Sequence, residues 1–303
     1  GNMLERMRVD EFLTALLSIV QPLAPLDLPL LDAHGATLAE DIFAGERLVL
    51  KGGSPIRSTT IGLAASIGKG HLPTRPHPRV VIISAGPDLI EPGNALSGNE
   101  EYETNSWQLT TIVREIGGVA YRVHSIPDNE EELKDIVEDQ LVRADLIVIS
   151  GERKDDSFEL ITRSLNQLGE VKVVDLELEN FGHFNYGTIG PDKTPVVTLP
   201  GDPINAYIAM QLFVRPMIRT MIGAKEVYCP SVKAKLEREY KGAISGRNYL
   251  LAVLSEDNAS VAIFNEQEDF VSLAAANSLV SVNSGDSMKA GESVTVVILP
   301  RIK

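Results

Sequence analysis

Short apolar segments alternate with amphipathic ones between residues 80 and 218, and this alternation constrains the fold more than any other feature of the sequence. The apolar segments are rich in β-branched residues, as in strands of a parallel sheet that is covered on both faces. The intervening segments repeat apolar residues at helical spacing. Strands are expected at residues 80–84, 120–125, 144–150, 171–176 and 196–199, and helices at 105–117, 129–142, 157–168 and 204–218. This order predicts an α/β fold, a doubly wound parallel sheet with helices on both faces.

The turn between strand 196–199 and helix 204–218 is the most informative in this region. It consists of Pro200, Gly201, Asp202 and Pro203. Aspartate is typical of a helix N-cap, and proline of the first helical turn that follows. Free backbone N–H groups and the positive end of the helix dipole make such a corner suitable for an anion. An ordinary strand–helix turn explains the same residues equally well, so both interpretations stay open.

Two further loops belong to the same predicted edge of the sheet. Ligands of doubly wound sheets bind beyond the carboxyl ends of the strands. Residues 84–93 and 150–157 follow predicted strands, as the turn at 200–203 does. We therefore expect these three loops to build any binding site.

Regions of different character flank the α/β segment. Residues 3–20 predict an amphipathic helix capped near Asp10, and residues 30–44 a short helix that starts at Asp32. After residue 226, short β-rich segments are separated by Gly, Asn and Asp turns, which is typical of a sandwich or barrel. We expect three domains: an N-terminal helical and extended segment (3–78), an α/β domain (79–225) and a small all-β domain (226–303).

Charge and cysteine content exclude several classes of protein. The net charge of −14 and the pI near 4.9 argue against a general nucleic-acid binder or a binder of acidic membranes. The single cysteine, Cys229, excludes a disulfide framework and a cysteine-based zinc site, and the histidines lack metal-ligand spacing. No apolar run reaches the roughly 18 residues of a membrane-spanning helix. We therefore expect a cytoplasmic protein.

Four motifs occur along the chain in a distinctive order. They are VVIISAGPDLIEPG at 80–93, YETN at 102–105, Ser150-Gly151 after a strand, and LPGDPINA at 199–206. In this order they resemble the motifs of the MoeA/gephyrin family, the molybdopterin molybdenumtransferases of molybdenum cofactor biosynthesis. The resemblance extends over nearly the whole chain, because residues 31–42 and 289–294 are similar to the family's first and last domains.

The resemblance implies a fold, a reaction and a set of site residues. The central domain would be a MogA-like molybdopterin-binding domain in a homodimer. The implied reaction inserts molybdate into adenylylated molybdopterin and releases AMP, at a site that depends on Mg²⁺. Binding of molybdopterin and its phosphate is assigned to Ser84, Gly86, Ser150, Gly151, Pro200, Gly201, Asp202 and Pro203. Catalysis is assigned to Asp88, Glu103 and Glu159, and metal binding to Asp88 and Glu103; for each carboxylate taken singly, a solvated loop charge is the more common explanation.

The sequence departs from the family between Asp41 and Ala44. There the family carries an inserted second domain, whereas this chain continues directly into FAGERLVLKGGSPI. The missing domain would form one wall of the family's active cleft.

The second departure is chemical. After Gly151 the family has small residues that let its backbone approach the ligand, but this chain has the charged residues 152–156. The family's K-P-G-K-P lysines align with Leu178–Tyr186, where His183 is the nearest basic group. Two functions therefore stay open: a molybdopterin molybdenumtransferase, or a catalytically inactive, gephyrin-like scaffold that binds a protein partner.

Overall fold

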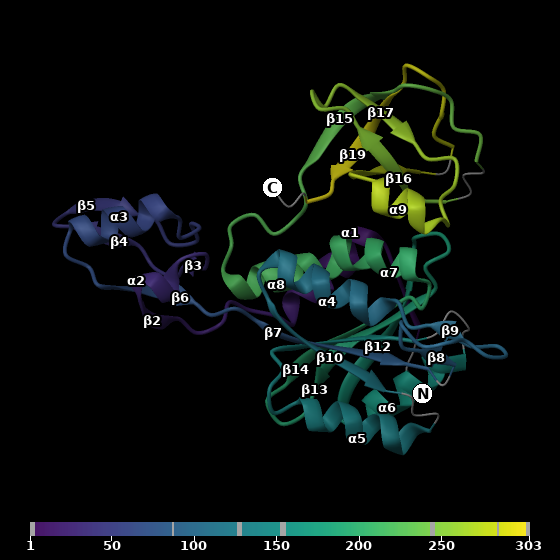
Figure 1. Cartoon of the computed structure of the whole chain (residues 1–303), viewed down its shortest axis with the longest axis horizontal. Helices are drawn as coiled ribbons and strands as arrows, with labels where there is room; N and C mark the ends of the chain where they lie inside the picture. Colours follow the sequence, from purple (N-terminus) through teal and green to yellow (C-terminus); the bar gives the residue numbers. More distant parts are fainter. Residues whose placement is uncertain are drawn as a thin grey trace.

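The chain forms an N-terminal lobe, a central α/β domain and a C-terminal barrel (Figure 1). The structure is a computed structural model, and it describes residues 4–86, 88–125, 129–151, 156–242, 246–283 and 285–300. Among these residues, no helix is long and apolar enough to cross a membrane.

The central sheet has seven strands in the order β1-β12-β13-β14-β11-β7-β10. The strands are β1 (Leu4–Met7), β7 (Arg79–Ala85), β10 (Val119–Ser125), β11 (Leu146–Ser150), β12 (Gly169–Leu176), β13 (His183–Ile189) and β14 (Thr194–Leu199). The predicted α/β sheet is confirmed, but it is mixed, because β13 runs antiparallel to both of its neighbours. β13 was not predicted, since polar and small residues interrupt its apolar pattern.

Helices cover both faces of this sheet. α1 (Val9–Ser18), α4 (Asn105–Ile116), α7 (Pro203–Ala209) and α8 (Arg215–Ile222) lie on one face, and α5 (Glu130–Gln140) and α6 (Asp156–Asn166) on the other (Figure 1). Successive residues of a strand point to opposite faces. In β7, Val80 and Ile82 therefore join the core beneath α4, while Val81 and Ile83 join the core beneath α5 and α6.

The helix expected over 204–218 is interrupted. A single π-helical turn, η1 (Met210–Val214), separates α7 from α8. Pro216, in the first turn of α8, has no N–H to donate to the preceding turn, so the regular helical pattern cannot continue through it.

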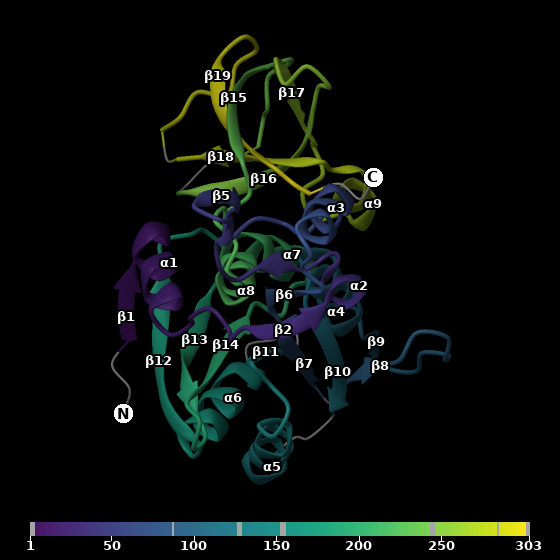
Figure 2. The same cartoon turned by 90° about the vertical axis from the view of Figure 1, so that its left-hand side faces the viewer.

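The helix expected over 3–20 is shorter than predicted. Residues 4–7 form β1, which pairs in parallel with β12 at one edge of the sheet, and α1 begins at Val9 rather than at Asp10 (Figure 2). The open edge of β12 offers hydrogen bonds that override the local helical pattern. Phe12 of α1 then packs against Phe184 and Phe213, with ring centroids 5.2 and 5.1 Å apart.

We call residues 26–75 the N-terminal lobe. It contains β2 (Leu26–Pro29), α2 (Leu30–Ala33), β3 (Thr37–Leu38), β4 (Ile42–Ala44), β5 (Arg47–Leu50), α3 (Ser58–Ser66) and β6 (His71–Arg75). The helix expected over 30–44 is limited to α2, because Gly35 adopts a left-handed φ of +88° that ends it. The antiparallel pair β4–β5 stands at the position of the family's inserted domain.

The C-terminal region is a closed barrel, one of the two predicted arrangements. Its strands are β15 (Ser231–Leu236), β16 (Asn248–Leu254), β17 (Ser260–Ile263), β18 (Ser278–Val282) and β19 (Ser293–Ile298), in the order β15-β17-β16-β18-β19. A short helix, α9 (Phe270–Ala275), which was not predicted, packs beside β16.

Candidate functional site

The carboxyl ends of three adjacent strands meet at one edge of the central sheet. In the strand register, Ser150 at the end of β11 pairs with Ser84 of β7 on one side and Leu199 of β14 on the other. All three residues are buried. The loops that start at 84, 150 and 200 therefore leave the sheet side by side, as parallel strands require.

The Ser150 hydroxyl is an unsatisfied polar group at this edge. Ser150 is fully buried, yet its Oγ has no hydrogen-bond partner among the residues that the structure describes. An unsatisfied buried polar group costs about 1–3 kcal/mol, so a ligand or water that reached it would be bound favourably. Of the charged residues 152–156 that are predicted to obstruct this position, 152–155 lie outside the described residues.

The predicted N-cap at the 200–203 turn is confirmed. One carboxylate oxygen of Asp202 accepts hydrogen bonds from the backbone N–H groups of Ile204 at 2.8 Å and Asn205 at 3.1 Å. These are donors that an anion at the start of α7 would need. A ligand anion at this corner therefore competes with the Asp202 carboxylate and is repelled by its charge.

The first turn of α4 holds this corner in place. Asn105 donates from its side-chain amide to the carbonyl of Gly201 at 2.9 Å, and Gln108 donates to the carbonyl of Pro203 at 2.9 Å. Asn105 is buried, and its Oδ1 has no partner among the described residues. The YETN motif and the LPGDPINA motif are thus joined directly.

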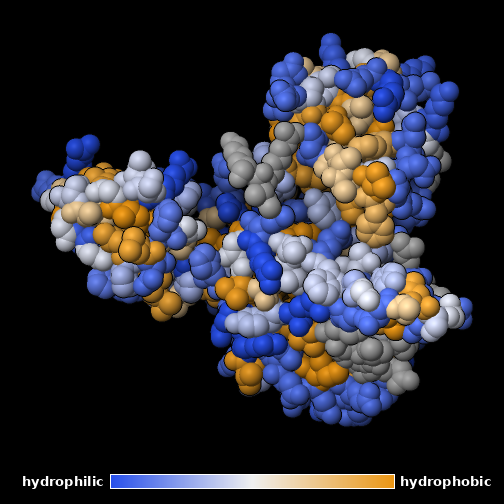
Figure 3. All heavy atoms as spheres, viewed as in Figure 1, coloured by the Kyte–Doolittle hydropathy of each residue, from blue (hydrophilic) through white to orange (hydrophobic). Residues whose placement is uncertain are grey.

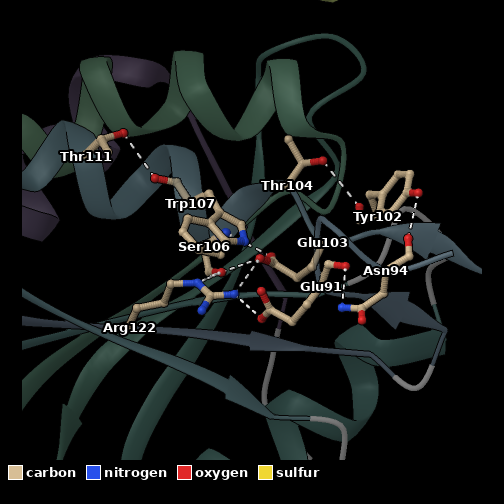
Figure 4. Close-up of polar contacts among 9 residues, drawn as sticks. All are labelled: Glu91, Asn94, Tyr102, Glu103, Thr104, Ser106, Trp107, Thr111 and Arg122. Atoms are coloured by element: carbon tan, nitrogen blue, oxygen red, sulfur yellow. Dashed lines mark hydrogen bonds and ion pairs between the residues drawn. The ribbon is translucent and has the colours of Figure 1, made fainter.

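Glu103 lies in a cluster of polar side chains at the same end of α4 (Figure 4). Its carboxylate is 1% exposed and accepts hydrogen bonds from the backbone N–H of Ser106, at 2.9 Å, and from the Ser106 hydroxyl. Arg122 of β10 lies 3.5 Å from the same carboxylate and forms a second ion pair with Glu91. The partners of Glu103 thus come from the protein, which favours a structural role; its assignment as a catalytic group and metal ligand stays a prediction.

Arg122 connects the cluster to an aromatic ring. Its Nε donates to the Ser106 hydroxyl at 2.7 Å, and its guanidinium carbon lies 4.1 Å from the centroid of the Trp107 ring. Trp107 itself is 47% exposed. No sequence signal points to Arg122 or Glu91, because their meeting depends on β10 lying next to β7.

The other predicted catalytic carboxylates lie in different surroundings. Asp88 is exposed on the loop after β7, next to the short parallel pair β8 (Leu89–Ile90) and β9 (Glu101–Tyr102). The Glu159 side chain is 83% exposed on α6, 3.9 Å from Arg163. Within the part of the chain that the structure describes, no three His, Cys, Asp or Glu side chains group as metal ligands.

A cavity that the sequence did not predict lies at the same edge of the sheet, beyond β12. It has a volume of about 730 Å³ and is lined by residues 175–180 and by Arg6, Arg8, Arg247 and Asn283. Arg247 donates through Nη2 to the Tyr249 hydroxyl at 3.0 Å, but its Nε is buried without a partner among the described residues. The three arginines are balanced by Asp175, Glu177 and Glu179, and Arg6 pairs with the first two.

Several known proteins with related sequences have names that refer to molybdopterin. The sequence profile of a family described as a probable molybdopterin binding domain matches residues 81–220. Molybdopterin molybdenumtransferase 1 of Mycobacterium tuberculosis is 27% identical over 277 residues, which cover 88% of this chain and 65% of that protein. Molybdopterin molybdenumtransferase 2 of the same organism is 29% identical over 255 residues, which cover 82% and 63%.

The fold is also shared with a solved structure. A molybdopterin biosynthesis MoeA protein of Pyrococcus horikoshii superposes with a TM-score of 0.81 at 19% identity, covering 98% of this chain and 100% of that one. The chain spans less than two thirds of the length of the two M. tuberculosis relatives.

Proposed function

Since this chain is a member of the MoeA family, we propose that it acts in molybdenum cofactor biosynthesis and binds molybdopterin, or adenylylated molybdopterin, at the carboxyl edge of its central sheet. The proposed reaction is the transfer of molybdate to the adenylylated form with release of AMP. The observation that carries the proposal is the unpartnered hydroxyl of the fully buried Ser150. A hydroxyl can donate to a phosphate or pterin oxygen, and Asn105 Oδ1 offers an acceptor that also lacks a described partner.

The residues at this edge have separate tasks in the proposal. Ser84 and Ser150 supply hydroxyl groups at the strand ends, and Gly86 and Gly151 let the ligand approach the backbone. The turn from Pro200 to Pro203 forms the opposite wall, which Asn105 holds in position. The anionic part of the ligand is assigned to the neighbouring cavity, because Arg247 offers a buried, unpartnered N–H there, whereas Asp202 repels negative charge at the turn.

Of the two residues predicted to bind Mg²⁺, one fits the coordination that this ion prefers. Mg²⁺ commonly uses one or two carboxylates together with substrate phosphates and water. Asp88 is exposed and fits that pattern, whereas Glu103 is buried on Ser106 and Arg122 and does not. Asp88 would therefore be the residue that holds the ion beside the ligand's phosphate, and the catalytic role of Glu159 stays a prediction.

A homodimer and a cytoplasmic location complete the proposal. Leu26, Leu31, Phe43 and Leu48 are exposed on the N-terminal lobe, where Figure 3 shows apolar side chains gathered on the surface. An apolar surface of this kind is suited to a second copy of the chain. Sedimentation at several concentrations is expected to give a dimer, and a monomer at all concentrations would contradict the proposed homodimer.

The cysteine content supports the proposed cytoplasmic location. The chain has a single, half-buried cysteine, which suits a compartment where thiols stay reduced.

The proposal is tested by calorimetric titration with molybdopterin and adenylylated molybdopterin. Ser150→Ala is expected to weaken binding about tenfold, the loss of one ligand hydrogen bond. Ser278→Ala is a matched control, because Ser278 is also fully buried with an unpartnered hydroxyl but lies in β18 of the barrel. Equal affinities of the wild type and Ser150→Ala would remove this assignment, and no binding by the wild type would contradict the proposed function. The scaffold alternative then gains support.

A further inference from the structure

A second cavity lies between the N-terminal lobe and the central domain, away from the carboxyl edge of the sheet. Its volume is about 380 Å³. One wall consists of residues 35–37 and 53–55 of the lobe, and the other is formed where α4 and α8 end, near Gly117 and Ala224. Both helices end on the side of the molecule that faces the lobe (Figure 1).

The lining of this cavity carries a strong positive charge. Four cationic side chains line it (Arg57, Arg75, Arg219 and Lys225), against the single carboxylate of Glu226. None of the four forms an ion pair with another residue in the described part of the chain. The whole chain has a net charge of −14, so this concentration of unpaired cations runs against its general character.

Structural roles account for only part of this charge. Arg75 donates one N–H to the carbonyl of Leu23 at 2.6 Å, and Arg219 donates its Nε–H to the carbonyl of Glu226 at 3.0 Å. The two helix C-termini at the cavity together offset about one positive charge. Roughly two positive charges remain in excess, and most of the guanidinium N–H groups remain available to a ligand.

Two glycines fix the cationic side chains against the cavity walls. Gly223 has a left-handed φ of +76°, and a Cβ there would lie 3.0 Å from Arg75 Nε. Gly53 has a φ of +87°, and a Cβ there would lie 3.1 Å from Lys225 Cγ. The stems of Arg75 and Lys225 thus pack directly on backbone, and each contact joins the lobe to the central domain. Positioned head groups lose less conformational entropy when they bind an anion.

We propose that this cavity binds the phosphate group of a small molecule. The half-buried Arg75 and Arg219 hold the phosphate, and the exposed Arg57 and Lys225 stand at the opening. Arginine matches the geometry of phosphate oxygens and binds them through pairs of N–H groups. The apolar side chains of Ile116 and Ile222 form part of the wall and can contact the body of a phosphate ester. A ligand held from both sides fixes the lobe relative to the central domain.

The test compares inorganic phosphate, AMP and adenosine in calorimetric titrations of the full chain. Phosphate and AMP are expected to bind and adenosine is not. Tighter binding of AMP than of phosphate assigns the site to phosphate monoesters, and equal binding assigns it to free phosphate. Arg57→Gln combined with Lys225→Gln is expected to weaken binding about tenfold or more, since two of the four positive charges that attract the phosphate are removed.

The controls separate this cavity from the proposed molybdopterin site. Arg47→Gln removes an exposed cation of the same lobe outside the cavity, and it is expected to leave phosphate binding unchanged. Ser150→Ala is also expected to leave it unchanged, so the two sites can fail independently. The unfolding temperature without phosphate verifies that each variant is folded. The absence of phosphate binding, or equal binding by the double variant and the wild type, overturns the proposal.

Discussion

The side-chain amide of Asn105 donates a hydrogen bond to the main-chain carbonyl of Gly201, 2.9 Å away. This contact joins the first turn of α4 to the turn that precedes α7. The two segments lie far apart in the sequence, yet both carry motifs that resemble those of the MoeA family. The geometry of the 200–203 turn therefore depends on a helix that begins nearly a hundred residues earlier, and substitutions at Asn105 report on that dependence.

Asn105→Ala is expected to lower the free energy of unfolding by about 1–3 kcal/mol, because the carbonyl of the half-buried Gly201 loses its donor. Urea denaturation measures this change. Thr111→Ala serves as the control, since Thr111 is exposed on the same helix and its hydroxyl donates to the helix carbonyls of Trp107 and Gln108. Its expected effect stays within about 0.5 kcal/mol. Equal effects of the two substitutions would show that the contact with Gly201 contributes nothing.

Asp202→Asn is expected to strengthen the binding of molybdopterin. Asparagine caps a helix about as well as aspartate, so the turn keeps its hydrogen bonds to Ile204 and Asn205 while the negative charge is removed. The gain is expected to be about threefold to tenfold at low salt and smaller at high salt, because screening weakens the repulsion. Calorimetric titration at two salt concentrations measures it.

The matched control is Asp192→Asn, which removes an exposed carboxylate outside the site. Unchanged or weaker binding by Asp202→Asn would show that the Asp202 carboxylate does not repel the bound ligand. Equal gains from both variants would indicate a general effect of net charge.

Much of the arrangement at the sheet edge follows from the sequence. Ser84, Ser150 and the turn after Leu199 each follow an apolar strand segment, and parallel strands bring such positions together. The cluster of Glu91, Glu103 and Arg122 could not be predicted from the sequence. These residues come together only through the order of the strands and the path of the loop between β8 and β9.

Contacts between domains were still less accessible from the sequence. Arg247 reaches its cavity only because the barrel packs beside the end of β12, and no local pattern encodes that packing. The same holds for β1, whose residues have a helical pattern but pair with an open strand edge. Local periodicity predicts an element only where long-range pairing does not compete with it.

Arg122→Met is expected to destabilise the protein by about 2 kcal/mol, because it leaves the buried carboxylate of Glu103 without a cation. The cost falls below that of a fully buried pair, since Arg122 is 22% exposed and Ser106 still donates to Glu103. Combining it with Glu103→Gln is expected to cost less than the sum of the two single changes. Urea unfolding of the four proteins gives the coupling energy, and strict additivity would argue against the pair.

Stability is expected to fall when the pH rises above 10, and Tyr207 is the main reason. Burial raises the pKa of Tyr207 to about 12 from an ordinary value of 10.0, and burial also raises the pKa of the Cys229 thiol. A group whose pKa is higher in the folded state stabilises the protein fully below its unfolded pKa. That contribution is lost as the pH rises from 10 toward 12, because the unfolded chain then releases the proton more readily.

Urea unfolding at pH 8, 9, 10 and 11 is expected to show this decline in stability, and Tyr207→Phe is expected to make the decline shallower. Tyr228→Phe is the control, since Tyr228 is exposed and its substitution should leave the pH dependence unchanged. A wild-type profile that stays flat to pH 11, or one that Tyr228→Phe alters as much as Tyr207→Phe, would contradict the assignment.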